Sequence, residues 1–283
     1  MLRSSPALAI LAAATLVSAG RALSQPTLEY TIEAIRFGTI PQFRVASLVV
    51  GADPGERLDI ATIIWLIRGG GRNILFDSGY HRATPGFDRF KTTDYVRPDE
   101  AVALAGVEPA QITDIVISHV HWDHMGGIDL FPAATIWIQR EEYEYYMGRS
   151  WQPGETRGAD VDDLVTLLKR NAAGNVRLVD GDDREFLPGI RAYTGARHTF
   201  ASQYLRVAGT PPFVLASDNC YLYRNLETKS PIAQTFTAGD RAANVAAFDR
   251  MIALAGARER VIPGHDPRQF ERFPTKGRVA KIK

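Results

Sequence analysis

One short segment, rich in potential metal ligands, constrains this sequence more than any other feature. Its four candidate ligands lie within six residues: His119, His121, Asp123 and His124. They directly follow the apolar run 115–117, which is typical of a buried strand. In extended backbone, side chains two residues apart point the same way, so His119 and His121 can bind one ion together. We therefore predict a metal site here, and not a polar turn in which histidines occur by chance.

A second ion position is indicated by the residues after His121. Gly126 and Gly127 provide the permissive backbone for a turn. That turn directs Asp123 and His124 towards a neighbouring position. Because the chain has six histidines and three of them lie in this segment, the segment is the first candidate for function.

The composition of the 283 residues is ordinary for a globular protein, with 45% hydrophobic and 23% charged residues. The formal net charge of +1 is close to neutral, which argues against nucleic acid as a partner. The single cysteine, Cys220, excludes an intramolecular disulfide, and we interpret it as a small buried residue.

Residues 1–24 have the pattern of a secretory signal peptide. A basic start is followed by an apolar run over 7–17, and small residues precede the expected cleavage site after Ser24. The apolar run is too short for a permanent membrane-spanning helix, so no membrane partner is expected. No linker divides the rest, so 25–283 is predicted to be a single domain, periplasmic or secreted after cleavage.

Hydrophobic patterning predicts two sheets with helices outside them. The run 61–67 is continuously apolar, as expected of a central strand, and 73–76 returns as its hairpin partner. A strand is also predicted over 43–50. Residues 161–170 form an amphipathic pattern with Leu164, Leu167 and Leu168 on one side. In the second half of the chain, four further strands and a helix over 240–254 are predicted. Both halves thus have strands followed by a helix, which suggests two sheets packed face to face.

Further candidate ligands occur where predicted strands end. His198, Asp218 and His265 each follow an apolar strand. Because they occur in addition to the ligand-rich segment, we interpret them as further ligands and not as isolated turn residues. Asp77 ends another strand, and it is either a turn acceptor or an anchor that orients a ligand histidine. His81 has no partner at metal-ligand spacing and is interpreted as a loop residue.

These residues resemble the metallo-β-lactamase superfamily, whose His-x-His-x-Asp-His motif is matched by the segment 119–124. The later His, Asp and His of that family correspond to His198, Asp218 and His265. The resemblance covers about 35–270. It implies the α/β class, as an αββα four-layer sandwich with the metal site at one edge of the two sheets.

By the same resemblance, the protein would bind two divalent metal ions. One ion would be held by His119, His121 and His198, and the other by Asp123, His124 and His265, with Asp218 bridging the two. Imidazole and carboxylate ligands suit Zn²⁺, with Fe, Mn or Co as alternatives. Two such ions about 3.5–4 Å apart would hold a bridging hydroxide that is a nucleophile near neutral pH.

Within the superfamily, the chain is most similar to N-acyl-homoserine lactonases. True β-lactamases generally lack a bridging carboxylate at the position of Asp218, whereas the lactonases also carry a tyrosine three residues later, as Tyr221 is here. The resemblance implies that Tyr221 donates a hydrogen bond to the substrate carbonyl, although packing beneath the site is the alternative. The residues expected to act in catalysis are Asp123, Asp218 and Tyr221.

The leading hypothesis is a hydrolase domain that opens a lactone, so a small lactone or ester is its expected partner. Whether the protein forms a homodimer is left open. The alternatives are an exported phosphotriesterase or arylester hydrolase on the same site, and a metal-binding protein without catalysis. Four aromatic residues are candidates for an apolar acyl pocket, although core or loop packing would explain each: Phe43, Phe87, Phe90 and Trp151.

Overall fold

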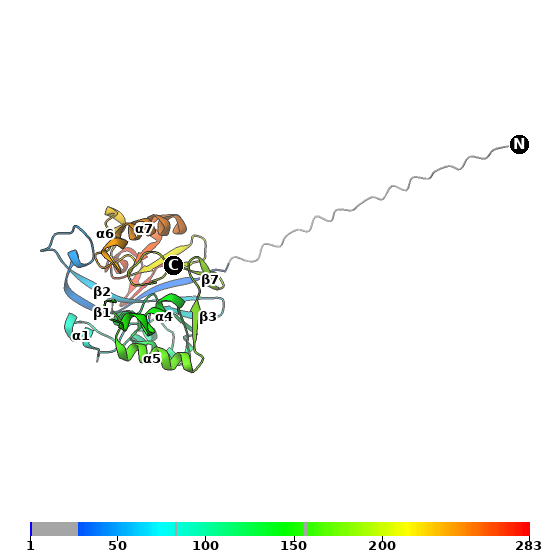
Figure 1. Cartoon of the computed structure of the whole chain (residues 1–283), viewed down its shortest axis with the longest axis horizontal. Helices are drawn as coiled ribbons and strands as arrows, with labels where there is room; N and C mark the ends of the chain where they lie inside the picture. Colours follow the sequence, from blue (N-terminus) through cyan, green and yellow to red (C-terminus); the bar gives the residue numbers. More distant parts are fainter. Residues whose placement is uncertain (2–27, 83, 156–157) are drawn as a thin grey trace.

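The computed structural model describes residue 1 and residues 28–82, 84–155 and 158–283 (Figure 1). Apart from Met1, the signal peptide predicted for 1–24 lies outside the described residues. Within the described ranges, no helix combines the length and the apolar character that crossing a membrane would require.

Within the described residues, the strands form two sheets, of eight and five strands. The larger sheet has the order β12-β13-β1-β2-β3-β4-β5-β6, in which β3 to β6 are parallel and the other neighbours antiparallel. Its strands are β1 (Thr31–Arg44), β2 (Arg57–Gly69), β3 (Arg72–Phe76), β4 (Asp114–Val116), β5 (Thr135–Gln139), β6 (Val176–Val179), β12 (Thr275–Lys276) and β13 (Val279–Lys281).

The smaller sheet has the order β11-β10-β9-β8-β7, and its β10 and β11 are parallel. Its strands are β7 (Arg184–Leu187), β8 (Ile190–Tyr193), β9 (Tyr204–Val207), β10 (Phe213–Ser217) and β11 (Val261–Pro263). The strands predicted at 73–76 and in the second half of the chain are thus confirmed.

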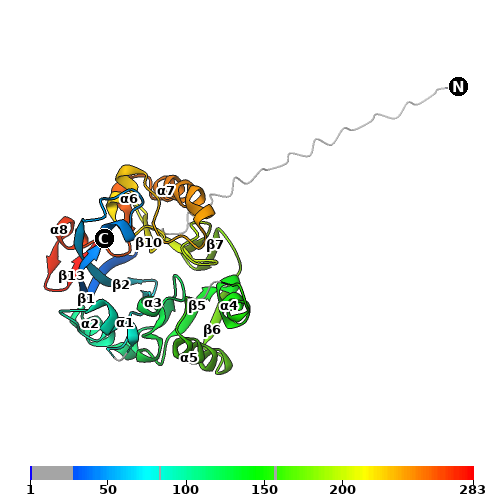
Figure 2. The ribbon, with the colours of Figure 1, turned by 60° about the vertical axis from the view of Figure 1, so that its left-hand side comes forward.

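Helices cover the outer face of each sheet. The helices of the described residues are α1 (Pro85–Phe90), α2 (Pro98–Leu104), α3 (Trp122–Met125), α4 (Arg140–Met147), α5 (Val161–Ala172), α6 (Tyr223–Thr228), α7 (Arg241–Ala255) and α8 (Gln269–Arg272). Figure 2 shows α6 and α7 on the side of β10, whereas α1, α2 and α5 lie on the opposite side. The predicted αββα four-layer sandwich is confirmed.

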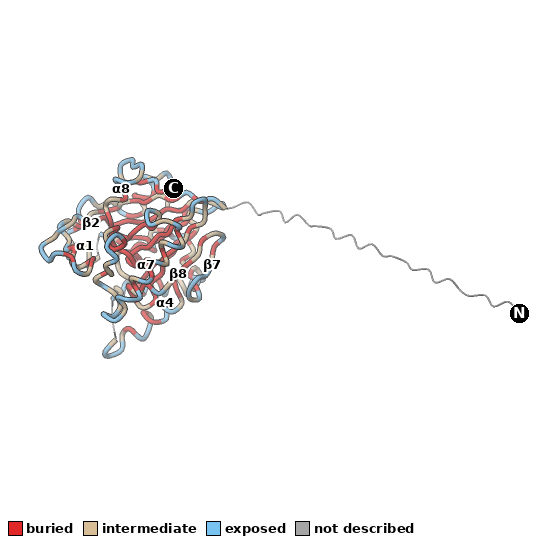
Figure 3. Tube along the Cα trace, turned by 90° about the horizontal axis from the view of Figure 1, so that it is seen from above, coloured by how far each residue is buried: buried red, intermediate tan, exposed pale blue. Residues whose placement is uncertain are grey.

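The central strand β2 is buried on both faces, which explains its continuous apolar sequence (Figure 3). Ile64 and Leu66 face the cluster beneath α2 and α5, while Trp65 and Ile67 face the cluster between the two sheets. Each such side chain contributes about 1.5–3 kcal/mol of burial free energy to folding.

The prediction of a strand over 43–50 is wrong. Instead β1 runs on to Arg44, and a short 3-10 turn follows at Val45–Ser47. Strand β1 continues past Pro41 with an irregularity in its pairing with β2 between Ile40 and Phe43, where Gln42 has a φ of 52°. The apolar residues after Arg44 are buried in a third cluster, against the helices that cover the smaller sheet.

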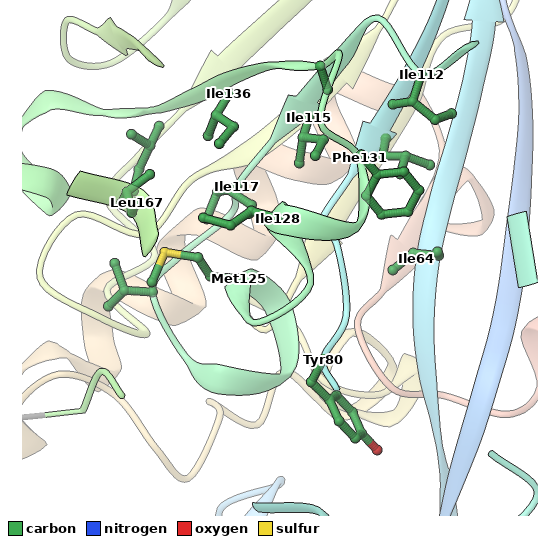
Figure 4. Packing of buried hydrophobic residues seen from close by; sticks show 14 of the residues in the cluster. Ile64, Tyr80, Ile112, Ile115, Ile117, Met125, Ile128, Phe131, Ile136 and Leu167 are labelled. Atoms are coloured by element: carbon green, nitrogen blue, oxygen red, sulfur yellow. The ribbon is translucent and has the colours of Figure 1, made fainter. Parts of the chain in front are cut away.

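Helix α5 is amphipathic as predicted, but its buried face is narrower than expected. Leu167 is fully buried in the cluster that also contains Ile117, Met125 and Ile136 (Figure 4), and Leu164 is also buried. The prediction that Leu168 shares this face is wrong, because its exposed fraction is 51%. The large sheet covers only the part of the helix surface around Leu164 and Leu167.

These adjacent leucines provide a matched test of the packing. Leu167→Ala should lower the free energy of unfolding by about 2–5 kcal/mol, because it leaves a cavity beneath the sheet. Leu168→Ala should change it by less than about 0.5 kcal/mol. Urea unfolding of both variants under one metal condition measures this, and similar losses in the two would contradict the assigned orientation of α5.

Candidate metal centre

The candidate centre lies where the carboxyl ends of four strands meet at one edge of the sandwich. Strands β3 and β4 are parallel in the larger sheet, and β10 and β11 are parallel in the smaller one. Asp77 follows β3, the segment 118–124 follows β4, Asp218 follows β10, and His265 follows shortly after β11. His198 reaches the same edge from the loop between β8 and β9.

The structure brings all seven predicted ligands together. Within each of two groups, the potential ligand atoms lie within 4.8 Å of one another. The first group consists of His119, His121, His198 and Asp218, and the second of Asp123, His124 and His265. The other six ligands divide as the family resemblance implied, whereas Asp218, the implied bridge, falls in the first group.

The Asp218 carboxylate lies between the two groups. Its Oδ1 atom is 2.9 Å from His265 Nε2 and 3.3 Å from His124 Nε2. Its Oδ2 atom is 3.5 Å from His198 Nε2 and 3.9 Å from His119 Nε2. One oxygen therefore faces each group, which is the arrangement required of a shared ligand.

The spacing of the donor atoms fits metal ions. His121 Nδ1 is 3.0 Å from both His119 Nε2 and His198 Nε2. Ligand nitrogens about 2.0–2.1 Å from a tetrahedral Zn²⁺ lie roughly 3.3 Å from one another. Two buried atoms of the cluster, His124 Nε2 and Asp218 Oδ1, have no hydrogen-bond partner of acceptable geometry. Cations between these atoms would satisfy both.

Four histidines use Nδ1 for contacts with neighbouring protein groups, and their Nε2 atoms face the centre. His198 Nδ1 is 2.8 Å from the carbonyl of Gln234, and His265 Nδ1 is 2.8 Å from the carbonyl of Ala61. Because a carbonyl can only accept, Nδ1 donates its proton in these two rings, and Nε2 is the ring nitrogen left to bind a metal. Comparable contacts join His119 Nδ1 to the Ser118 hydroxyl and His124 Nδ1 to Asp77.

Asp77 is an anchor for the site as well as a turn residue. Its Oδ2 atom is 2.9 Å from His124 Nδ1 and also accepts hydrogen bonds from the hydroxyls of Ser118 and Ser217. Its Oδ1 atom accepts the Ser118 backbone N–H at 2.8 Å. Of the two roles left open by the sequence, orientation of a ligand histidine is the one that the contacts support.

Unusual backbone conformations surround the centre. Asp77, Arg197 and Ser217 have φ values of 64°, 60° and 47°, in the left-handed region that non-glycine residues rarely adopt. The last two directly precede His198 and Asp218. Such strain is maintained by the surrounding contacts and is common at functional sites.

A glycine is required beside Asp218. A Cβ atom at Gly264 would lie 2.7 Å from Asp218 Oδ1 and 2.8 Å from the Ser217 carbonyl. The absence of a side chain therefore lets the loop after β11 approach Asp218 closely enough to bring His265 next to it.

Burial and neighbouring charges give the donor atoms different proton affinities. Burial, together with His198, lowers the pKa of His121 to about 3, which keeps its ring neutral. Burial alone would raise the pKa of Asp218, but the charges of His124 and His265 outweigh it and hold the pKa well below its usual range. The centre thus offers a neutral imidazole and an ionised carboxylate, the forms that bind metal ions.

A cavity of about 400 Å³ opens onto the centre, within the usual range for small-molecule sites. His121, Asp123, Asp218, Tyr221 and His265 lie in its wall. Its apolar part is lined by Ile40, Phe43, Leu48, Ile60, Phe90 and Trp122.

Two of the four predicted pocket aromatics, Phe43 and Phe90, thus line the cavity. Phe87 and Trp151 instead pack against the core cluster beneath the larger sheet. The sequence reasoning missed Trp122, whose ring stacks on Phe90 with centroids 5.8 Å apart. Its position inside the ligand motif was the available signal.

Tyr221 is buried at the cavity wall, with its ring against His198 and His265. Its hydroxyl is 3.3 Å from His198 Nδ1. The side chain therefore packs under the centre and also presents a hydroxyl beside it, so neither of the predicted roles is eliminated by its position.

His81 and Cys220 lie outside the two ligand groups. His81 Nε2 is 2.7 Å from Asp129 Oδ1, in a loop away from the cluster. Cys220 is buried, and its thiol lies 3.4 Å from the Leu222 carbonyl.

Sequence reasoning also missed the polar side chains that support the ligands, namely Ser118, Ser217 and Glu142. Glu142 is fully buried in α4. Helical spacing was the signal for it, because Glu142 falls on the same face as the buried Tyr145 and Tyr146, whereas Glu141 is exposed.

The contact between Asp77 and His124 generates a prediction on metal binding. Asp77→Asn removes the charge that the His124 Nδ1–H faces, so metal affinity at the second group should fall roughly 10- to 100-fold. Competition with a chromophoric chelator measures this affinity. Asp129→Asn, which changes an exposed carboxylate outside the cluster, is the matched control, and equal affinities in the two variants would exclude the anchoring role.

Comparison with known proteins identifies the family. The family model described as "Metallo-beta-lactamase superfamily" matches residues 60–265. The chain is 29% identical over 183 residues to the N-acyl homoserine lactonase AttM of Rhizobium johnstonii, and the match covers 62% of this chain and 65% of that enzyme, just under two thirds of its length. It is 27% identical over 194 residues to an N-acyl homoserine lactonase of Bacillus, with 64% and 72% covered.

Solved structures show the same fold at lower identity. A mutant of B. thuringiensis AiiA, with N-decanoyl-L-homoserine bound at its active site, superposes with a TM-score of 0.69 at 20% identity, covering 88% of this chain and 98% of that one. AidC, described as a dizinc quorum-quenching lactonase in complex with a product, gives a TM-score of 0.64 at 17% identity, with 86% and 90% covered. On its sequence match and its αββα architecture, this chain belongs to the metallo-beta-lactamase superfamily.

Proposed function

We propose that this protein is a metal-dependent hydrolase that opens the ring of a lactone, with N-acyl-homoserine lactones as the substrate class. The observation that carries the proposal is the position of Asp218 between two ligand groups, beside a cavity that Tyr221 helps to line. The sequence similarity to N-acyl homoserine lactonases supports the choice of substrate.

Two divalent ions would be held by the two ligand groups, with Asp218 shared. A pair of such ions supplies a nucleophile from water near neutral pH and polarises an ester carbonyl. The nitrogen and oxygen donors suit Zn²⁺, and they also accept Fe, Mn or Co.

Tyr221 would stabilise the developing negative charge on the substrate carbonyl oxygen. Burial, reinforced by the charges of Asp218 and Asp123, raises the pKa of this phenol well above its usual range. The hydroxyl therefore keeps its proton and can donate a hydrogen bond to an oxyanion in the cavity.

Asp123 and Asp218 would accept and return a proton during ring opening. Both carboxylates lie in the cavity wall, and their pKa values are held low by the charge of His124 against the opposing effect of burial. An ionised carboxylate in this position can accept a proton and return it to the alkoxide that leaves when the ring opens.

The cavity also matches the two ends of an acylated lactone. Its lining includes ionisable side chains, beside which the polar ring would react, and the side chains of Phe43, Phe90 and Trp122, which form an apolar wall for an acyl chain. Each methylene buried against that wall contributes about 0.8 kcal/mol to binding.

A substrate panel tests the proposed function. On the metal-loaded protein, kcat/KM should be higher for an N-acyl-homoserine lactone than for a phosphotriester or a β-lactam, because the site combines a shared carboxylate with an oxyanion donor. A pH-indicator assay measures all three, and the Asp218→Ala variant verifies that turnover belongs to this centre. Faster hydrolysis of the phosphotriester would favour the alternative activity and overturn the proposal.

Tyr221→Phe tests the role of the hydroxyl. Loss of one oxyanion donor should lower kcat by roughly 10- to 1000-fold, towards the lower end because metal ions also polarise the carbonyl. The metal content should stay unchanged. Tyr223→Phe is the control, because the Tyr223 hydroxyl is buried without a hydrogen-bond partner and its ring packs against Arg268 and Arg272. Full activity in Tyr221→Phe would leave this residue with a packing role only.

A further inference from the structure

A single buried carboxylate connects the two chain segments that carry the first ligand group. Glu142 lies on the inner face of α4, with no exposed surface. It is not among the potential metal ligands of the centre. A charged side chain in this position is costly unless hydrogen bonds satisfy its oxygens, so its contacts explain why it is there.

The Glu142 carboxylate accepts three hydrogen bonds. Its Oε1 atom accepts the Val120 backbone N–H at 3.3 Å and the Thr199 hydroxyl at 2.6 Å. Its Oε2 atom accepts the Ala201 backbone N–H at 2.7 Å. Val120 lies between His119 and His121, and Thr199 directly follows His198.

The three donors therefore come from both segments that supply histidines to the first group. His119 and His121 follow β4 of the larger sheet, whereas His198 lies in a loop of the smaller sheet. Because these segments are far apart in sequence, the distance between their imidazoles depends on contacts that join them. Glu142 provides three such contacts through one side chain.

We propose that Glu142 is a positioning residue that sets the metal affinity of the group formed by His119, His121 and His198. This inference rests on the metal centre of the proposed function. The side chain would act by fixing the backbone on both sides of the ligands, so that three nitrogen atoms converge before an ion binds. No residue of the second group takes part in the hydrogen bonds of Glu142. His124 of that group is instead oriented by Asp77.

Only a carboxylate satisfies this arrangement. Three donors converge on two oxygens, and a glutamine in the same position has one oxygen and one NH₂ group. Because the Thr199 hydroxyl can also accept a hydrogen bond, the donor that faces the NH₂ group would be the backbone N–H of Val120 or of Ala201. The backbone at that point must shift, and small shifts in supporting contacts typically weaken metal binding by about 10- to 100-fold.

The test is a metal titration of Glu142→Gln against wild type, with Glu141→Gln as the matched control on the exposed side of the same helix. Zn²⁺ affinities of both groups are measured by chelator competition, and folding is monitored by circular dichroism. In Glu142→Gln, we expect the affinity of the group formed by His119, His121 and His198 to fall roughly 10- to 100-fold while the other affinity is retained. The weakened affinity should therefore differ from the one that Asp77→Asn weakens. Glu141→Gln should bind as wild type does.

A second variant covers the case in which Glu142→Gln fails to fold. Thr199→Val removes one donor but leaves the carboxylate in place, so a smaller loss confined to the same affinity is expected. Unchanged affinities in both variants, or an equal fall in both affinities, would overturn the inference.

The titration contains no substrate, so it separates the two proposals. Selective weakening in a protein that hydrolyses no lactone would support the role of Glu142 and contradict the proposed function. Lactone hydrolysis together with normal metal binding by Glu142→Gln would support the proposed function and contradict the role of Glu142.

Discussion

The hydrogen bonds around Asp77 join the two sheets at the edge where the candidate metal centre lies. Ser118 follows a strand of the larger sheet and Ser217 ends a strand of the smaller one, and both hydroxyls donate to the same Asp77 oxygen. The two hydroxyls are also 2.9 Å apart. Since each group takes ligands from both sheets, the spacing of the ligands within each group depends on this junction.

The centre concentrates ionisable groups that folding alone would not favour. Burial of several histidines and carboxylates without counter-charges is costly, and two of their atoms lack hydrogen-bond partners. Bound cations would offset this cost, so metal binding and folding of this edge should be coupled. The protein has a single cysteine, so cross-links within the chain cannot provide this stability.

Much of the fold and the ligand set could be predicted from the sequence. The ligands are recognisable because metal binding restricts both residue type and spacing, and strand β2 is recognisable because burial on both faces gives a continuous apolar run. Leu168 was misassigned because periodicity gives the direction of a buried face but not its width. The course of the chain after Pro41 depends on the conformation of Gln42, which no local pattern reveals. Glu142 was missed because its partners are distant in sequence.

The central claim is that two metal ions bind on either side of Asp218. Anomalous diffraction from crystals of the zinc-loaded protein, with data on both sides of the zinc absorption edge, tests it most directly. We expect two anomalous peaks about 3.5–4 Å apart, each next to one Asp218 oxygen. A single peak, or a pair of peaks that Asp218 does not bridge, would contradict it.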